Sequence, residues 1–402
     1  MDLRGGRQPP RPALLFACKR LHKRGDKVKR ESPAGGKFCT PARQIGEVLC
    51  SGPAGSWRAP SIKTPRAASG ARETRRFATI PFVALEADES ALGALERSGA
   101  VVSVEEDHVL RAADAESDAI VEADQAWAEG FDGTGWTVAV VDTGVDAAHP
   151  LLAGKVIDEA CFSTNGNCPN GQTEQLGSGA GAPCTYTADG CAHGTHVAGI
   201  AVGSSSSLGL FGVARGASAI AVQVFSRFDT ASDCSPDPVP CAQAYTSDIV
   251  AGLERVYALR SQHKIAAVNL SLGGGSYSSQ ATCDAQNPAT KAAIDNLVSA
   301  GIAVVAAAGN DGNATALEAP GCISSAVSVG ATDKSDAIAS FSDSAPFLSL
   351  LAPGVSITSA YPGNRLAIGS GTSEATPHVS GAWAVIKQKM ETADVAAVLA
   401  SL

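Results

Sequence analysis

Three glycine-containing segments of this chain carry an acid, a base and a nucleophile. They read Val-Val-Asp142-Thr-Gly, His193-Gly-Thr-His-Val and Gly-Thr-Ser373-Glu-Ala-Thr-Pro-His-Val. A serine hydroxyl is too weakly acidic to attack an amide carbonyl unaided, so it requires a neighbouring base. An imidazole serves as that base, and a carboxylate holds the imidazole in the required tautomer. These residue types therefore predict nucleophilic catalysis at a carbonyl carbon.

The order acid, base, nucleophile separates classes of protein, because the same side chains occur on unrelated folds in different orders. Asp, His, Ser is the order of the subtilisin-type serine peptidases, and the three segments closely resemble the signatures of that family. The resemblance covers residues 78–402. It implies that Ser373 is the nucleophile, His193 the base and Asp142 the residue that orients the imidazole. Asp146 is a rival carboxylate, but the resemblance places the acid at the end of the strand.

The resemblance also assigns substrate contacts. Asn310 ends an Ala-Ala-Gly-Asn segment, and in the family this asparagine donates to the oxyanion of the tetrahedral intermediate; alone, it reads equally as a turn residue. Residues 269–274 resemble the strand that pairs with an extended substrate. The walls of the first specificity pocket are then Ser271, Leu272 and Gly273 on one side and Ala307, Ala308 and Gly309 on the other. Small residues on both walls predict a roomy apolar pocket.

Three features depart from the family pattern. The residue after the serine is usually methionine and here is Glu374, whose negative charge would raise the pKa of His193. The calcium-ligating aspartate of the Bacillus subtilisins is replaced by Leu151, so no metal ligand is assigned; we expect no required cofactor, with calcium optional as a structural ion. Only 29 residues follow Ser373, which predicts a shortened closing segment.

Predicted strands and helices alternate from Trp136 onward. The main strands are expected at 136–141, 217–225, 266–272, 302–308 and 326–329, with shorter ones at 348–351, 357–361 and 365–369, and the helices at 246–263, 287–300 and 373–390. Such alternation predicts an α/β fold with a mainly parallel sheet between two helical layers, the three-layer sandwich of the subtilisin-like family. Asp142 and Asn310 fall at carboxyl ends of strands, where sites of such sheets lie.

The amino-terminal part differs in character. Residues 1–76 carry a net charge of +13 and residues 77–402 a net charge of −22, which sum to −9. Residues 78–112 predict a strand, a helix and a strand, resembling the second half of a ferredoxin-like α+β inhibitory propeptide. We therefore divide the chain into a basic, disordered head (1–77), a partial propeptide (78–112) and a peptidase domain (118–402). A nucleic-acid-binding or membrane-binding tail is the alternative for the head.

Eleven cysteines are present, of which eight follow residue 112. They lie in polar loops, which favours disulfides and an oxidising compartment over buried thiols, and no Cys-x-x-Cys spacing indicates zinc. Three pairs share one short spacing (161/168, 184/191 and 234/241), leaving 283/322, although 161/191 with 168/184 is equally open. We expect a secreted protein, although no convincing signal peptide is visible.

The sequence thus predicts a monomeric serine endopeptidase, made as a zymogen, that acts through an acyl-enzyme. Its partners would be polypeptide substrates and its own propeptide, without nucleic acid and without a membrane span. The alternative is a catalytically impaired relative that binds peptides. An acid-active sedolisin is disfavoured by His193 and Asn310, since that group uses Glu and Asp there. An α/β-hydrolase is disfavoured because Gly-x-Ser-x-Gly is absent around Ser373.

Overall fold

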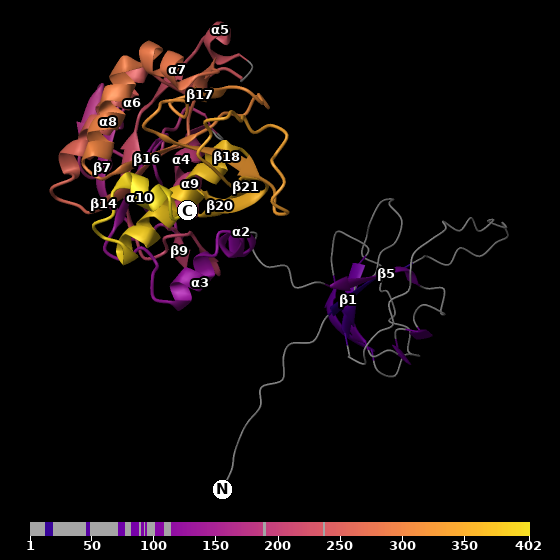
Figure 1. Cartoon of the computed structure of the whole chain (residues 1–402). Helices are drawn as coiled ribbons and strands as arrows, with labels where there is room; N and C mark the ends of the chain where they lie inside the picture. Colours follow the sequence, from indigo (N-terminus) through magenta and orange to yellow (C-terminus); the bar gives the residue numbers. More distant parts are fainter. Residues whose placement is uncertain are drawn as a thin grey trace. The chain divides into compact units, whose positions relative to one another are not determined.

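The computed structural model describes residues 114–402 except 188–189 and 236–237, and before them residues 13–18, 46–48, 71–76, 82–87, 90–91, 93–94 and 101–107. The chain forms two compact units, Met1–Arg111 and Ala112–Leu402 (Figure 1).

The first unit contains a sheet in the order β1-β5-β2-β4-β3. β1 is antiparallel to both β4 and β5. The strands are β1 (Ala13–Cys18), β2 (Gly46–Val48), β3 (Ala71–Arg76), β4 (Phe82–Ala87) and β5 (Val101–Asp107). Residues 90–91 and 93–94 are helical, so the described residues follow the strand, helix and strand predicted for this stretch.

Three of these strands lie in the segment for which the sequence predicts a disordered head. β1, β2 and β3 all lie within residues 1–77 and are paired with β4 or β5. The physical reason is visible for β1, whose sequence Ala-Leu-Leu-Phe-Ala-Cys is an apolar run of strand length. That run is too short for the core of a signal peptide, and it pairs instead with the two strands of the predicted propeptide.

The second unit is built on an eight-stranded sheet in the order β19-β18-β16-β14-β6-β11-β7-β8. Its strands run parallel except for β8, which is antiparallel to β7. The strands are β6 (Thr137–Asp142), β7 (Val156–Phe162), β8 (Glu174–Leu176), β11 (Ser218–Gln223), β14 (Ile265–Leu270), β16 (Ala303–Ala307), β18 (Val327–Thr332) and β19 (Leu350–Pro353). This confirms the predicted mainly parallel α/β sheet.

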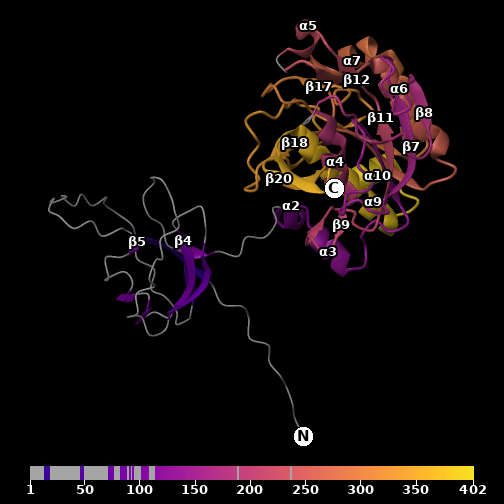
Figure 2. The same cartoon turned by 180° about the vertical axis from the view of Figure 1, so that it is seen from behind.

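Two helical layers cover this sheet (Figures 1 and 2). α4 (His193–Val202) and α9 (Thr372–Lys389) contribute to one core, and α6 (Thr246–Leu259) and α8 (Pro288–Ser299) to the other. Alternate residues of β6 enter the two cores, because side chains of a strand alternate between its faces. Val138 and Val140 pack with α4 and α9, whereas Val141 packs with α6 and α8.

Smaller elements complete the unit. The helices are α2 (Asp114–Ile120), α3 (Ala123–Ala128), η1 (Gly190–Ala192), α5 (Ala231–Cys234), α7 (Gln280–Gln286) and α10 (Val395–Leu399). Paired short strands are β9 (Ser204–Ser205) with β10 (Leu210–Phe211), β12 (Phe225–Phe228) with β13 (Cys241–Ala244), β15 (Gly274–Tyr277) with β17 (Leu317–Ala319), and β20 (Ile357–Tyr361) with β21 (Arg365–Gly369). Within the described residues, no helix combines the length and apolar character that a membrane crossing demands.

One predicted strand is divided in two. The run expected over 217–225 ends as β11 at Gln223, and β12 leaves the sheet to pair with β13. The side-chain oxygen of Gln223 accepts a hydrogen bond from the backbone N–H of Phe225, which turns the chain at this point. The apolar run alone does not reveal this break.

Four disulfides link the cysteines of the second unit. They join Cys161–Cys168, Cys184–Cys191, Cys234–Cys241 and Cys283–Cys322. The equal-spacing scheme is therefore confirmed over the crossed pairing of the first four. Three of the bridges close short loops, with a sequence separation of 7, whereas the fourth spans 39 residues.

The loop lengths predict unequal contributions to stability. In the chain-entropy model a bridge restricts the unfolded chain more when its loop is longer, giving about 4 kcal/mol for Cys283–Cys322 and about 2.5 kcal/mol for Cys161–Cys168. Replacing each pair by alanine should lower the free energy of unfolding in guanidinium by these amounts. The cysteines of both bridges are buried, so removing either bridge loses a similar amount of packing. Equal losses would contradict this account.

Candidate active site

Asp142 is the last residue of the central strand β6 and is fully buried. Its carboxylate accepts hydrogen bonds from the backbone N–H of Thr143 at 2.7 Å and from Nδ1 of His193 at 2.8 Å. The Thr143 hydroxyl accepts a bond from the N–H of Gly194 at 2.9 Å. These contacts hold the start of α4 against the end of β6, so the acid and the imidazole are fixed relative to each other.

Gly194 makes this close approach possible. A Cβ at this position would lie 2.4 Å from the carbonyl oxygen of Gly144 and 3.2 Å from the Cβ of Asp142. Any other residue would push α4 away from the strand end. The glycine after His193 is therefore a packing requirement of the Asp142–His193 pair.

The His193 imidazole is oriented as a base. Because its Nδ1–H is bonded to Asp142, Nε2 is the nitrogen that can accept a proton, and 28% of the side chain is exposed to solvent. Burial lowers the pKa of this imidazole, but the charge of Asp142, the hydrogen bond to it and the charge of Glu374 outweigh burial and raise the pKa to about 9. The base is thus neutral in alkaline solution.

Ser373 lies in the first turn of α9, whose N-cap is Gly371. Its hydroxyl donates to the carbonyl oxygen of Ser271 at 3.1 Å, and the Ser271 hydroxyl donates to the Ser373 carbonyl at 2.8 Å. These reciprocal bonds attach the start of the helix to the segment that follows β14. Among the described contacts, the Ser373 hydroxyl is bonded to this segment and not to the imidazole of His193.

Asn310 presents a free donor next to Ser373. Its side-chain oxygen accepts bonds from the N–H and the hydroxyl of Thr372, at 2.8 and 3.1 Å. Because a backbone N–H only donates, this contact fixes which end of the amide is oxygen. The Nδ2 group then makes no hydrogen bond within the described residues, and the side chain is exposed. It can donate to a negatively charged oxygen of a ligand.

The predicted pocket walls follow two neighbouring parallel strands. Ser271, Leu272 and Gly273 come directly after β14, and Ala307, Ala308 and Gly309 end or follow β16. The first wall, together with His193 and Tyr277, lines a groove of about 800 Å³. The structure therefore brings the base and this wall to one groove.

Glu318 on β17 was not foreseen from the sequence. A Cβ at Gly273 would lie 2.4 Å from its Oε2, and a Cβ at Gly309 would lie 2.7 Å from its Cγ. The Glu318 side chain therefore contacts both predicted walls, so a carboxyl group lies beside the pocket that the sequence predicts to be apolar. No sequence signal marks Glu318, because its place depends on the pairing of β15 with β17.

Glu374 is a buried carboxylate directly after Ser373. It is 6% exposed, and its Oε1 lies 3.4 Å from Nδ1 of His196. His196 donates from Nε2 to the carbonyl of Ala367, so this pair joins α4, α9 and β21. The effect expected of Glu374 on His193 agrees with the cause of the raised pKa given above.

The remaining histidines have structural contacts. His378 is buried, which lowers its pKa to about 4, and it donates from Nδ1 to the carbonyl oxygen of Glu374. His149 accepts at Nδ1 from the N–H of Leu151 and donates from Nε2 to the carbonyl of Arg365. Leu151 itself is a buried core residue beside α4.

The geometry described so far combines a mainly parallel α/β sheet with an oriented imidazole, a serine at a helix start and a free amide donor. Comparison with known proteins identifies the group. Residues 133–401 match the family described as "Subtilase family". The chain is 33% identical to Subtilisin E of Bacillus subtilis (strain 168), covering 80% of this chain and 74% of that protein. It is 35% identical to the alkaline protease of Alkalihalobacillus alcalophilus, covering 78% and 70%.

A solved structure agrees. The crystal structure of a cold adapted subtilisin-like serine proteinase superposes with a TM-score of 0.50 at 29% identity, covering 67% of this chain and 81% of that one. This chain belongs to the subtilase family, and it is a serine endopeptidase.

The raised pKa of His193 predicts an alkaline activity profile. Since only the neutral imidazole accepts a proton, kcat/KM should rise with pH and level off above about 9. Glu374→Gln removes one charge that stabilises the imidazolium, so the rising limb should move to lower pH. Profiles of kcat/KM from neutral to strongly alkaline pH would measure this shift. Glu391→Gln, at an exposed carboxylate that pairs with Lys264, is the control, and equal profiles for all three proteins would refute the role of Glu374.

Proposed function

We propose that this endopeptidase cleaves peptide bonds through Ser373, His193 and Asp142, with Asn310 as a donor to the oxyanion. The observation that carries the proposal is the buried Asp142 carboxylate bonded to Nδ1 of His193. That bond fixes the tautomer in which Nε2 accepts a proton. The nearby start of α9 supports the placement of the nucleophile, since a helix amino terminus favours negative charge.

In the first half of the reaction, the Ser373 hydroxyl turns from the Ser271 carbonyl toward His193. Its oxygen attacks the peptide carbonyl carbon while its proton passes to Nε2 of His193. The electron pair of the carbonyl moves onto oxygen, which accepts a hydrogen bond from Nδ2 of Asn310. When the C–N bond breaks, His193 gives its proton to the leaving nitrogen, and an ester between the substrate and Ser373 remains.

In the second half, water replaces the leaving amine. His193 takes a proton from the water as its oxygen attacks the ester carbonyl, and the oxyanion forms again beside Asn310. Cleavage of the ester returns the proton to Ser373 and releases the carboxylic acid product. Asp142 remains ionised throughout and stabilises the imidazolium in both halves.

The proposal includes an inhibitory propeptide and an extracellular site of action. The strand, helix and strand within residues 82–107 support the propeptide, with its boundary near the start of the second unit. Four disulfides support an oxidising compartment. We further propose that the enzyme acts as a monomer and that structural calcium is optional.

One observation favours the alternative of a peptide-binding protein with impaired catalysis. The Ser373 hydroxyl is bonded to the Ser271 carbonyl, which belongs to the predicted substrate segment. If that bond persisted with substrate present, Ser373 would stay unactivated. Labelling by a fluorophosphonate separates the two functions, because only an activated serine reacts. A folded protein that takes up no label would establish the alternative.

Ser373→Ala should abolish peptide hydrolysis and removal of the propeptide. The expected loss is about 10⁶-fold in kcat, the magnitude measured when the nucleophile of a subtilisin is removed. Hydrolysis of a peptide anilide and the mass of the purified chain measure the two effects. The control is Ser276→Ala, at an exposed serine of β15. A Ser373→Ala protein that still processes itself would overturn the assignment.

Asn310→Ala should lower kcat and leave KM nearly unchanged, because the oxyanion exists only in the transition state. The range measured for loss of one such donor from a subtilisin is about 10²- to 10³-fold. Asn313→Ala is a matched control, since that asparagine caps the neighbouring turn through Thr315. Rates must be normalised to active sites titrated with the fluorophosphonate. An Asn310→Ala enzyme that is less stable but turns over normally would assign Asn310 to the turn.

A further inference from the structure

We propose that the first specificity pocket selects a basic side chain, lysine or arginine, at the residue whose carbonyl is attacked, and that Glu318 is the residue that determines this preference. This inference rests on the proposed function and names the substrate class of the same site. It departs from the apolar pocket expected from the small residues of the two walls.

The first observation is where Glu318 lies. Its carboxylate contacts Gly273 of one wall, and its Cγ contacts Gly309 of the other. Gly309 directly precedes Asn310, so the Glu318 side chain contacts the residue next to the proposed oxyanion donor. The neighbouring residue Ala319 lines the same groove as His193 and Gly273. Glu318 thus lies against both walls, next in sequence to a residue that lines the groove.

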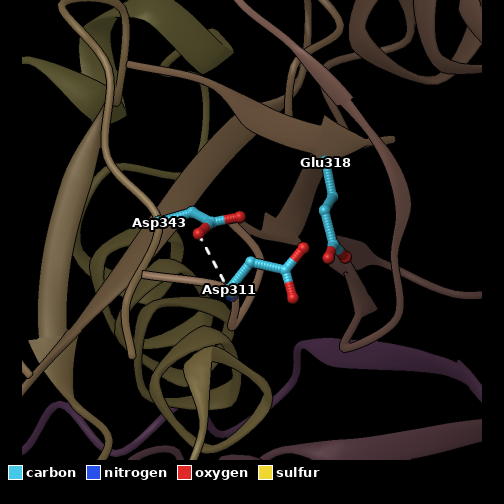
Figure 3. Close-up of side chains that lie close together, drawn as sticks. All are labelled: Asp311, Glu318 and Asp343. Carbon is cyan, nitrogen blue, oxygen red and sulfur yellow. Dashed lines mark hydrogen bonds between the residues drawn. The ribbon is translucent and has the colours of Figure 1, made fainter. Parts of the chain in front are cut away.

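The second observation is the absence of a partner for this charge within the described residues. Glu318 is half-buried, and its carboxylate makes no hydrogen bond or ion pair there. Instead, it faces the carboxylates of Asp311 and Asp343, with one oxygen of each of the three within 4.8 Å of the others (Figure 3). Burial and these two charges raise the pKa of Glu318 to about 7. A positive charge between the three groups would relieve this repulsion.

The third observation concerns Asp343, which is 2% exposed. Its Oδ1 accepts the backbone N–H groups of Asp311 and Asn313, at 3.1 and 2.7 Å. Its Oδ2 accepts no hydrogen bond from the described residues, and it would lie 2.2 Å from a Cβ on Gly309. This oxygen is directed to the backbone of the second wall, where a ligand donor in the pocket would reach it.

A basic side chain fits these groups better than a metal ion does. Calcium takes six to eight oxygen ligands, and this cluster consists of three carboxylate residues within the described part of the chain. A guanidinium offers five N–H donors and an ammonium three, which match a few carboxylate oxygens held apart. The charged head would also approach from the groove, on the side where the substrate chain is expected to lie.

The decisive experiment compares substrates that differ only in charge. Matched peptide anilides carrying arginine or its neutral isostere citrulline next to the scissile bond should differ in kcat/KM by about 10- to 100-fold, because hydrogen bonds to charged groups are the stronger kind. Glu318→Gln should remove most of this difference. Glu318→Lys should reverse the preference toward glutamate. Glu129→Gln, at an exposed surface pair with Lys389, should behave like the wild-type enzyme.

Two results would overturn the inference. One is a wild-type enzyme that cleaves the citrulline or leucine substrate as fast as the arginine substrate. The other is calcium that abolishes the preference for arginine and raises the melting temperature only while Glu318 is present, which would make the cluster a metal site. Both are measured with calcium or with a chelator in the assay.

If the proposed catalytic function is wrong, the results differ from those that would overturn the basic preference of the pocket. A protein that hydrolyses no substrate and takes up no fluorophosphonate would refute catalysis without testing the pocket. The pocket is then tested by calorimetry with benzamidine, a small amidinium, on the Ser373→Ala protein. Binding that is lost on adding Glu318→Gln supports the inference, whereas equal heats for the two proteins overturn it.

Discussion

The negative charge of Asp142, buried at the end of the central strand, is the constraint on which the active site depends. An ionised carboxylate without partners inside a protein is strongly destabilising, so it must be hydrogen-bonded and paired. The backbone N–H of Thr143 and Nδ1 of His193 donate hydrogen bonds to this carboxylate. That requirement draws the start of α4 to within hydrogen-bond distance of β6, which is possible only because Gly194 has no side chain. The geometry of the Asp142–His193 pair is thus a consequence of how a buried charge is stabilised.

The same principle attaches α9 to the sheet from the other side. Asn269 of β14 is fully buried and is bonded to both Ser271 and Ser380. Ser271 in turn exchanges hydrogen bonds with Ser373. Since all these partners lie on two elements, β14 with its following segment and α9, the position of Ser373 is set by side chains on the strand. The backbones of Ser373 and of the predicted substrate segment are therefore held together by hydrogen bonds.

Much of this arrangement was predictable because its signals are local. Asp142, His193 and Ser373 each lie in a short motif at an element end, and the apolar strands read directly from the sequence. Glu318 was not predictable, because its position depends on two short strands separated by 39 residues of chain being brought together beside Cys283–Cys322. β1 was missed for a related reason, since its pairing partners are far away in sequence. Nonlocal pairing leaves no periodic trace in a single segment.

The charge of Glu374 is one cause of the raised pKa of His193, and Glu318 contacts both predicted pocket walls. With a pKa of about 9, His193 is neutral in only about one molecule in a hundred at pH 7. A positive charge nearby disfavours the imidazolium and so lowers its pKa. In the proposed complex, a lysine or arginine beside Glu318 would bring such a charge into the cleft. A basic substrate would thus do two things: pair with Glu318 and increase the fraction of neutral base. Selectivity and activation would then arise from one charge, which a neutral substrate does not supply.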